Sequence, residues 1–261
     1  MSLNPLSLFR AMPGSIAQGM IWGVMALGVY ITFRLLDFAD LTVDGSIATG
    51  AAVSVMLIRA GVSPIATLPI AFLAGALAGM VTGLLNTALG IPGILASILT
   101  QISLYSINLN IMGKANQPVS VDNYPLVVSL RYVTDGSVSR LLFFLGMIVF
   151  LLALIAVMYW YFGTEQGHAI RATGCNGNMA RAQGINTNFI KVLALMISNG
   201  LVGLCGALYG QSRGHRMSIW DAVLSLSVWQ LLSSVRFSSV SLPARESLRS
   251  HLPWHRLFWA L

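Results

Sequence analysis

The feature that most constrains this chain is a series of apolar runs, several of which approach the ~20 residues that a helix needs to cross a bilayer. The runs cover residues 15–33, 45–58, 64–89, 91–112, 140–162 and 189–209. Of the 261 residues, 56% are hydrophobic and only 9% are charged, whereas a soluble globular domain carries about 25% charged residues. The sequence therefore predicts an all-α, polytopic helical membrane protein with about six hydrophobic segments, some of which can be re-entrant, and a divergent tail.

The net charge of +7 is explained by a lipid bilayer rather than by a nucleic-acid partner, because Lys and Arg collect in the short cytoplasmic loops of membrane proteins. One such loop covers residues 163–190, between two apolar runs. Its basic residues, together with the adjacent Lys191, outnumber a single acid, Glu165. By the positive-inside rule this loop is predicted to be cytoplasmic.

The same loop has a helical pattern. Residues 170–182 can form one helix despite Gly174 and Gly177, and Gly184 is placed to end it. Such a helix would lie across the membrane surface and present its arginines to the cytosol. A connector that is held by lipid headgroups is the alternative interpretation of this segment.

Three carboxylates, Asp37, Asp40 and Asp44, follow the first apolar run. Each would cost ~2.5–3.5 kcal/mol at the centre of an inserted helix. We therefore expect them at an interface, in a protein-lined cavity or in a broken helix. A plain interfacial loop meets this requirement, and so does a re-entrant turn that lines a path through the protein.

Polar side chains also occur within the apolar runs. The run 91–112 carries several, and because they would be costly facing lipid, we expect this segment to face other helices or an aqueous path. The candidates for lining a solute pathway are Asp44, Gln101, Asn108 and Asn199. Hydrogen bonds between helices would explain each of these four residues equally well.

Small residues recur at helical spacing in the run 64–89. Gly75, Gly79 and Gly83 lie four residues apart, on one face of a helix. Small residues at this spacing let helix backbones approach closely. The pattern predicts a helix-packing surface.

The apolar runs contain no recognisable catalytic or metal site. His168 is the only histidine before the tail, and no Ser/His, Cys/His or paired-carboxylate arrangement occurs within the runs. Cys175 and Cys205 lack metal-ligand spacing. The chain has no P-loop G-x-x-x-x-G-K-[ST], so it is not an ATPase, and nothing resembles the selectivity filter of an ion channel. An intramembrane enzyme is therefore disfavoured, and no cofactor or metal is expected in this chain.

The pattern G-x-x-I-R-A-x-G-x-N-x-x-x-A-x-x-x-G-I in the polar loop resembles the cytoplasmic coupling loop of ABC-importer permeases of the branched-chain amino acid and ribose type. Its fixed positions are Gly167, Ile170, Arg171, Ala172, Gly174, Asn176, Ala180, Gly184 and Ile185. Two further segments, D-L-T-V-D-G-S at 40–46 and I-P-G-I-L-A-S-I-L-T at 91–100, resemble other parts of the same permeases. The resemblance covers about residues 10–213, and it is closest to permeases associated with aromatic amino acid uptake.

The resemblance implies a multi-pass permease subunit of the bacterial cytoplasmic (inner) membrane. The subunit would belong to an ATP-driven importer whose solute is small and is expected to be an amino acid. The helix at 170–184 would insert into a groove on a separate cytoplasmic ATP-hydrolysing subunit, with Arg171 and Arg181 in polar contact with it. An extracytoplasmic solute-binding protein would deliver the solute. A second permease chain, expected to be identical, would complete the pore.

The tail departs from this pattern. Residues 214–261 hold four of the six Trp and three of the four His residues, where the family has a glycine-rich apolar segment. Back-translation of residues 228–236 permits a shifted frame that reads G-L-A-A-V-I-I-G-E. The sequence therefore suggests a permease domain at 1–213 and a divergent tail at 214–261 that arose by a frame slip near Gly214. A genuine C-terminus with one more span at 218–235 is the alternative, and a truncated, non-transporting remnant is the alternative function.

Overall fold

The structure is a computed structural model that describes residues 5–113, 116–117, 140–213 and 217–218. The described residues belong to the first of two units, Met1–Val223, and the second unit is Leu224–Leu261. Residues 114–139, which separate the predicted apolar runs 91–112 and 140–162, lie outside the described residues apart from 116 and 117. The same holds for the tail, apart from Met217 and Ser218.

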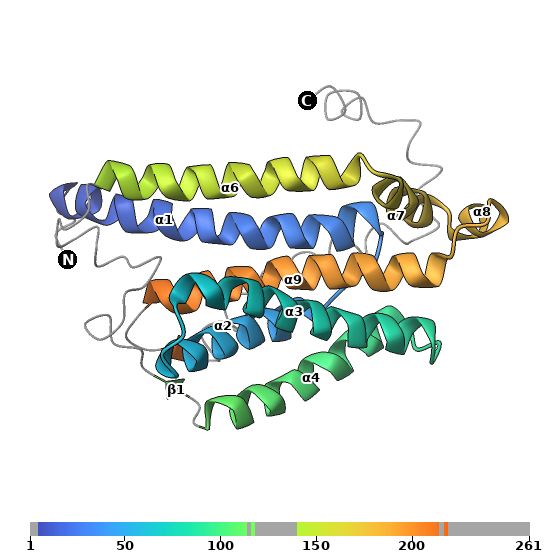
Figure 1. Ribbon diagram of the computed structural model, residues 1–261, viewed down its shortest axis with the longest axis horizontal. Helices are drawn as coiled ribbons and strands as arrows, with labels where there is room; N and C mark the ends of the chain where they lie inside the picture. Colours follow the sequence, from blue (N-terminus) through green and yellow to red (C-terminus); the bar gives the residue numbers. More distant parts are fainter. Residues whose placement is uncertain (1–4, 114–115, 118–139, 214–216, 219–261) are drawn as a thin grey trace. The chain divides into compact units, whose positions relative to one another are not determined.

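The described residues are almost entirely helical, which confirms the predicted fold class (Figure 1). The α-helices are α1 (Pro5–Tyr30), α2 (Val43–Arg59), α3 (Pro64–Thr87), α4 (Gly93–Met112), α6 (Arg140–Phe162), α7 (Glu165–Cys175), α8 (Gly177–Ala182) and α9 (Thr187–Arg213). A π-helical turn, η1 (Ile31–Leu35), continues α1. The two-residue strands β1 (Asn116–Gln117) and β2 (Met217–Ser218) pair antiparallel.

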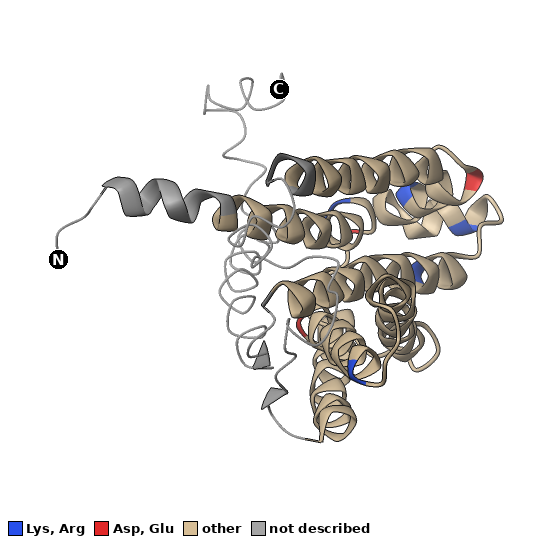
Figure 2. Cartoon of the chain, turned by 60° about the vertical axis from the view of Figure 1, so that its left-hand side comes forward, with Lys and Arg blue, Asp and Glu red and all other residues tan. Residues whose placement is uncertain are grey.

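Five of these helices are long and apolar enough to cross a membrane. They cover residues 14–35, 64–87, 93–112, 144–162 and 187–212. All six predicted apolar segments are helical, but α2 has 17 residues, fewer than the ~20 that a span needs. In the long helices the charged residues among the described ones lie near the helix ends, and the others lie in α7, in α8 and in connecting segments (Figure 2).

The helix α9 lies at the centre of the bundle. Most of its residues are buried, and it packs against α1, α2 and α3. In Figure 1 it runs between α1 and α6 on one side and α2, α3 and α4 on the other. Most residues of the α6 span, by contrast, are not buried, and its exposed face is apolar, as a surface that faces lipid requires.

Glycines bring α3 and α9 together. A Cβ added at Gly79 would collide with the carbonyl of Leu195, and one at Gly75 would collide with the carbonyl of Asn199. At Gly83 the nearest atom would be Val192 Cα, at 2.9 Å. The packing role predicted for the three α3 glycines is therefore confirmed: without side chains they let the two backbones touch.

The connection from α1 to α2 is irregular. Leu36 N–H donates to Ile31 O at 3.0 Å, which is a π-helical bond, and Asp37 follows in the left-handed region with φ 53°. The chain then passes through residues 38–42 before α2 begins at Val43. Single π-turns of this kind are frequent at functional sites.

Candidate functional site

The polar loop folds into two short helices, α7 and α8, which we call the elbow. We predicted one helix over 170–182, and this is wrong: α7 begins at Glu165 and ends at Cys175, and Asn176 separates it from α8. Asn176 is extended (φ −157°, ψ 97°), and its Oδ1 accepts hydrogen bonds from the N–H groups of Asn178 and Met179, both at 3.1 Å. Asn is a strong N-cap residue, so this side chain starts a new helix.

The elbow ends where the sequence predicts. Gly184 follows α8 in the left-handed conformation, with φ 84°, and its N–H donates to Arg181 O at 2.9 Å. Glycine adopts this conformation without the steric cost that a Cβ would add.

Two glycines set the elbow against the membrane helices. A Cβ at Gly167 would collide with the backbone of Phe162 at the end of α6, and a Cβ at Gly174 would collide with the carbonyl of Leu35 at the end of η1. Between them, Ile170 is 0% exposed. The elbow is thus held on its inner side by backbone contact.

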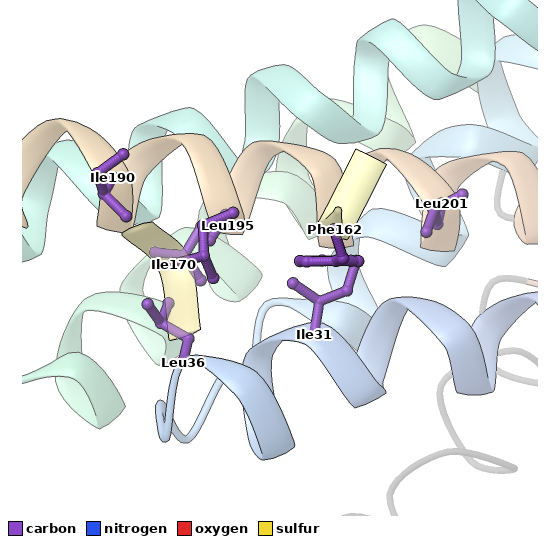
Figure 3. Close-up of a cluster of buried hydrophobic side chains, with 8 residues drawn as sticks. Ile31, Leu36, Phe162, Ile170, Ile190, Leu195 and Leu201 are labelled. Carbon is purple, nitrogen blue, oxygen red and sulfur yellow. The ribbon is translucent and has the colours of Figure 1, made fainter. Parts of the chain in front are cut away.

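Ile170 belongs to a buried apolar cluster that joins the elbow to three membrane helices (Figure 3). Its members are Ile31, Leu36, Phe162, Ile170, Ile190, Ala194, Leu195 and Leu201. They come from η1 and its end, from α6, from α7 and from α9. A displacement of α7 would therefore act directly on the central helix α9, because close-packed interiors transmit strain.

The two arginines of the elbow differ in role. Arg171 is exposed, and its guanidinium carbon lies 5.9 Å from the centroid of the Phe162 ring. Arg181 bonds within the chain: Nε donates to Thr187 Oγ1 at 2.7 Å, and Nη2 donates to Asn188 Oδ1 at 3.3 Å. Arg181 therefore ties α8 to the start of α9.

The remaining residues of the predicted coupling pattern mostly face inward. Ala180 is buried, and Ala172 and Gly174 are half-buried. Sequence reasoning did not single out Met179, which is 59% exposed on α8. The signal that could have identified it is a large apolar side chain within the otherwise polar loop. Much of the fixed pattern thus describes how the elbow is built, and Arg171 and Met179 form part of its free surface.

The connecting segment 36–42 enters the bundle. Asp37 is exposed, but Asp40 Oδ2 accepts a hydrogen bond from Asn199 Nδ2 at 2.7 Å, in the middle of α9. Thr42 and Thr82 share a hydrogen bond between their hydroxyls at 2.8 Å. A plain interfacial loop does not account for these contacts with α3 and α9, whereas a turn that folds back into the protein does.

Both polar atoms of the Asn199 side chain make hydrogen bonds. Its Oδ1 accepts from Ser46 Oγ at 2.6 Å, and its Nδ2 donates to Asp40 Oδ2 and, at 3.1 Å, to Leu195 O. These bonds join α9 to the connecting segment and to α2. Interhelix hydrogen bonding therefore explains Asn199 without a solute.

The other three pathway candidates behave differently. Asp44 is 2% exposed and accepts one hydrogen bond through Oδ2 from Gln101 Nε2, at 3.4 Å. Among the described residues, Asp44 Oδ1 and both polar atoms of Asn108 are buried and have no hydrogen-bond partner. Hydrogen bonds between helices therefore do not account for these atoms, although buried polar groups are rarely left unpaired.

Comparison with known proteins identifies the chain's relatives. Residues 12–232 match the family described as "Branched-chain amino acid transport system / permease component". The "Tyrosine transport system permease protein" of Clostridioides difficile (strain R20291) is 37% identical over 215 residues, which are 81% of this chain and 69% of that protein. The "Inner membrane ABC transporter permease protein YjfF" of Escherichia coli (strain K12) is 26% identical over 189 residues, 72% of this chain and 55% of the relative.

A third relative, the "Uncharacterized protein RP368" of Rickettsia prowazekii (strain Madrid E), is 33% identical over 200 residues, 77% of this chain and 68% of its own length. No solved structure matches the chain. The resemblance that the polar loop indicated is thereby confirmed. In such systems a separate subunit hydrolyses ATP, so the permease needs no cofactor of its own. The chain belongs to the permease family of branched-chain amino acid transport systems: it is a multi-span membrane protein, and not an enzyme.

Proposed function

We propose that this chain is the permease subunit of an ATP-driven importer for an amino acid, and that the elbow binds the ATP-hydrolysing subunit. The observation that carries the proposal is the construction of the elbow. Its inner side is fixed by Gly167, Ile170 and Gly174, while Arg171 and Met179 are exposed on a rigid support. A pre-ordered surface with one cationic and one apolar side chain suits a protein partner, because little conformational entropy is lost on binding.

The elbow is also connected, through the backbone, to the buried carboxylate of Asp44. Gly174 touches the carbonyl of Leu35, and the chain continues from there through Asp37 and Asp40 to Asp44. Movement of the elbow by the ATP-hydrolysing subunit would therefore shift the connecting segment, whose side chains bond to α9 and α3, and with it Asp44, which bonds to α4. This route supports a mechanism in which ATP binding rocks two permease chains between inward-facing and outward-facing states.

The relatives suggest a solute to test, and the resemblance to the permease family implies the remaining partners. The C. difficile protein that is 37% identical is named a tyrosine transport permease, which makes L-tyrosine the first solute to test. An extracytoplasmic solute-binding protein would deliver the amino acid. Two copies of this chain would form the pore, as the resemblance implies.

The native cysteines test elbow binding directly. Cys175 at the end of α7 is exposed, whereas Cys205 in α9 is buried. In the purified full-length chain, a maleimide should therefore react at Cys175, and addition of the ATP-hydrolysing subunit should protect it. Arg171→Glu should weaken this protection, while Glu165→Gln, which also changes an exposed charge on α7, should not. Unchanged labelling of Cys175 within an assembled complex would refute the proposed contact.

A further inference from the structure

Three buried polar atoms in the described part of the chain have no hydrogen-bond partner, and they lie on two neighbouring helices. They are Oδ1 of Asp44 on α2 and the Nδ2 and Oδ1 atoms of Asn108 on α4. Asp44 is 2% exposed and Asn108 is 0% exposed, so bulk water does not solvate them. Native proteins pair such atoms in the great majority of cases. These atoms are therefore candidates for binding a molecule that is not part of the chain.

Both side chains lie along one interface, which we call the α2–α4 seam. Near its start, a Cβ added at Gly45 would lie 2.8 Å from Leu104 Cδ1. Further along, Ala48 clusters with Met112. The order of these contacts shows that α2 and α4 run in the same direction here. Asn108 lies between Leu104 and Met112 on the buried face of α4, and so it belongs to the seam as well.

The chemistry of Asp44 selects a positively charged donor. Asp44 lies in the first turn of α2, where the helix dipole stabilises a carboxylate. Its one hydrogen bond from a described residue comes from the neutral amide of Gln101. A buried carboxylate requires a charged partner or several strong hydrogen bonds, and one long bond does not meet that requirement. The described residues contain no group of three His, Cys, Asp or Glu side chains that could hold a metal ion, so an ammonium group fits better than a metal.

We propose that Asp44 binds the ammonium group of the solute within the α2–α4 seam, and that Asn108 binds a polar group at the solute's other end. This inference rests on the amino-acid importer proposed above. Gln101, which bonds to Asp44, lies about 10 Å from Asn108 along α4, at 1.5 Å per residue. Asp44 and Asn108 would therefore contact different ends of a small molecule. The carboxamide of Asn108 offers both a donor and an acceptor, and a hydroxyl group can use both.

The seam is closed in this structure, and α4 is the helix that can open it. Six of the 20 residues of α4 are buried, whereas most residues of α9 are buried. An outward movement of α4 would therefore break fewer contacts than a movement of the central helix. Opening and closing of this seam would let the solute enter and leave.

Equilibrium binding to the full-length chain, in complex with its ATP-hydrolysing subunit in lipid nanodiscs, tests the inference. The probes are L-tyrosine, tyramine, which keeps the ammonium but lacks the carboxylate, and 3-(4-hydroxyphenyl)propionate, which lacks the ammonium. The wild-type chain should bind the first two, and it should bind the third at least about 30-fold more weakly, because the buried carboxylate would lose its charged partner. Asp44→Asn should weaken the binding of tyrosine and tyramine by a similar factor.

Two further variants separate binding from folding. Asp37→Asn is the matched control: it removes an exposed carboxylate from the same connection, and Asn tolerates the left-handed φ of 53°. Asn108→Leu replaces an unpaired buried amide by an apolar group of similar size, so thermal unfolding should show a chain at least as stable as the wild type. Its affinity for tyrosine should nevertheless fall about tenfold or more.

The outcomes distinguish this inference from the proposed function. Equal affinity of the wild type and Asp44→Asn for tyrosine would overturn the inference alone, and so would tight binding of the probe that lacks the ammonium. If the wild-type chain binds none of the three probes, the amino-acid assignment fails, and the inference fails with it. A loss of thermal stability in Asn108→Leu with unchanged affinity would give Asn108 a structural role and remove it from the site.

Discussion

Replacement of Asn199 by Ala would measure how strongly the connecting segment is held inside the bundle. The Asn199 carboxamide makes three hydrogen bonds, to Ser46 Oγ at 2.6 Å, to Asp40 Oδ2 at 2.7 Å and to Leu195 O at 3.1 Å. The variant would leave Asp40 with its bond from Thr42 N–H, at 2.8 Å. It would therefore detach the segment from α9 while leaving the local turn in place.

The magnitude follows from the kinds of bond. A hydrogen bond to a carboxylate contributes about 1.5–3 kcal/mol, and side-chain bonds between membrane helices average about 0.6 kcal/mol. Asn199→Ala should therefore lower the free energy of unfolding by roughly 3 kcal/mol. Asn199→Asp should lower it further, because a second carboxylate would then face Asp40.

The assay is denaturant-induced unfolding of the purified full-length chain in mixed micelles, followed by helical content. Asn110→Ala is the matched control, because Asn110 is exposed on α4 and exposed substitutions usually change stability by less than about 0.5 kcal/mol. If Asn199→Ala were as stable as Asn110→Ala, the buried network would not hold the segment, and the reasoning would be refuted.

Two further predictions concern packing and capping. Gly79→Ala places a Cβ against the carbonyl of Leu195 and should destabilise the chain by about 1–3 kcal/mol. Gly146→Ala is the control and should not destabilise the chain, because nothing lies within 4 Å of the added atom. Equal unfolding midpoints of the two variants would contradict the packing argument. Asn176→Ala removes the N-cap of α8 and should cost about 1 kcal/mol, seen as faster amide hydrogen exchange in α8. Asn178→Ala, at an exposed position, serves as its control, and indistinguishable exchange in the two variants would show that the cap does not stabilise α8.

The sequence was sufficient to predict the parts of the fold that depend on local composition. The apolar runs predict the membrane helices because their length and lack of charge are local properties. The spacing of Gly75, Gly79 and Gly83 predicts a packing face, though not its partner. That partner is the backbone of α9 from Val192 to Asn199, more than a hundred residues away in the chain.

The parts that were mispredicted or missed depend on one side chain or on distant contacts. The helical pattern of the sequence continues through Asn176. The helix breaks there because Asn176 Oδ1 accepts hydrogen bonds from the N–H groups of Asn178 and Met179. The sequence gives no sign that Arg181 has a partner within the chain. Its partner Thr187 lies beyond the turn at Gly184. The difference between Asn199, which is satisfied, and Asn108, which is not, cannot be read from residue type at all.

The tail hypothesis stays a prediction. The family match reaches residue 232, and most of residues 214–261 lie outside the described part of the chain. One long DNA sequence across the codons near Gly214 decides between a frame slip and a genuine C-terminus. An intact frame would make the tail genuine, and a shifted frame that restores a glycine-rich apolar end would support the slip.

The central claim is that this chain moves an amino acid across the membrane when the elbow is driven by ATP hydrolysis. The most direct measurement is uptake of radiolabelled L-tyrosine into proteoliposomes that contain the full-length chain and its ATP-hydrolysing subunit, with the solute-binding protein added at the extracytoplasmic face. We expect ATP-dependent uptake by the wild type and a large loss of uptake in Arg171→Glu. An assembled wild-type complex that hydrolyses ATP but accumulates no tyrosine or other amino acid would contradict the claim, and it would favour a non-transporting remnant of a permease.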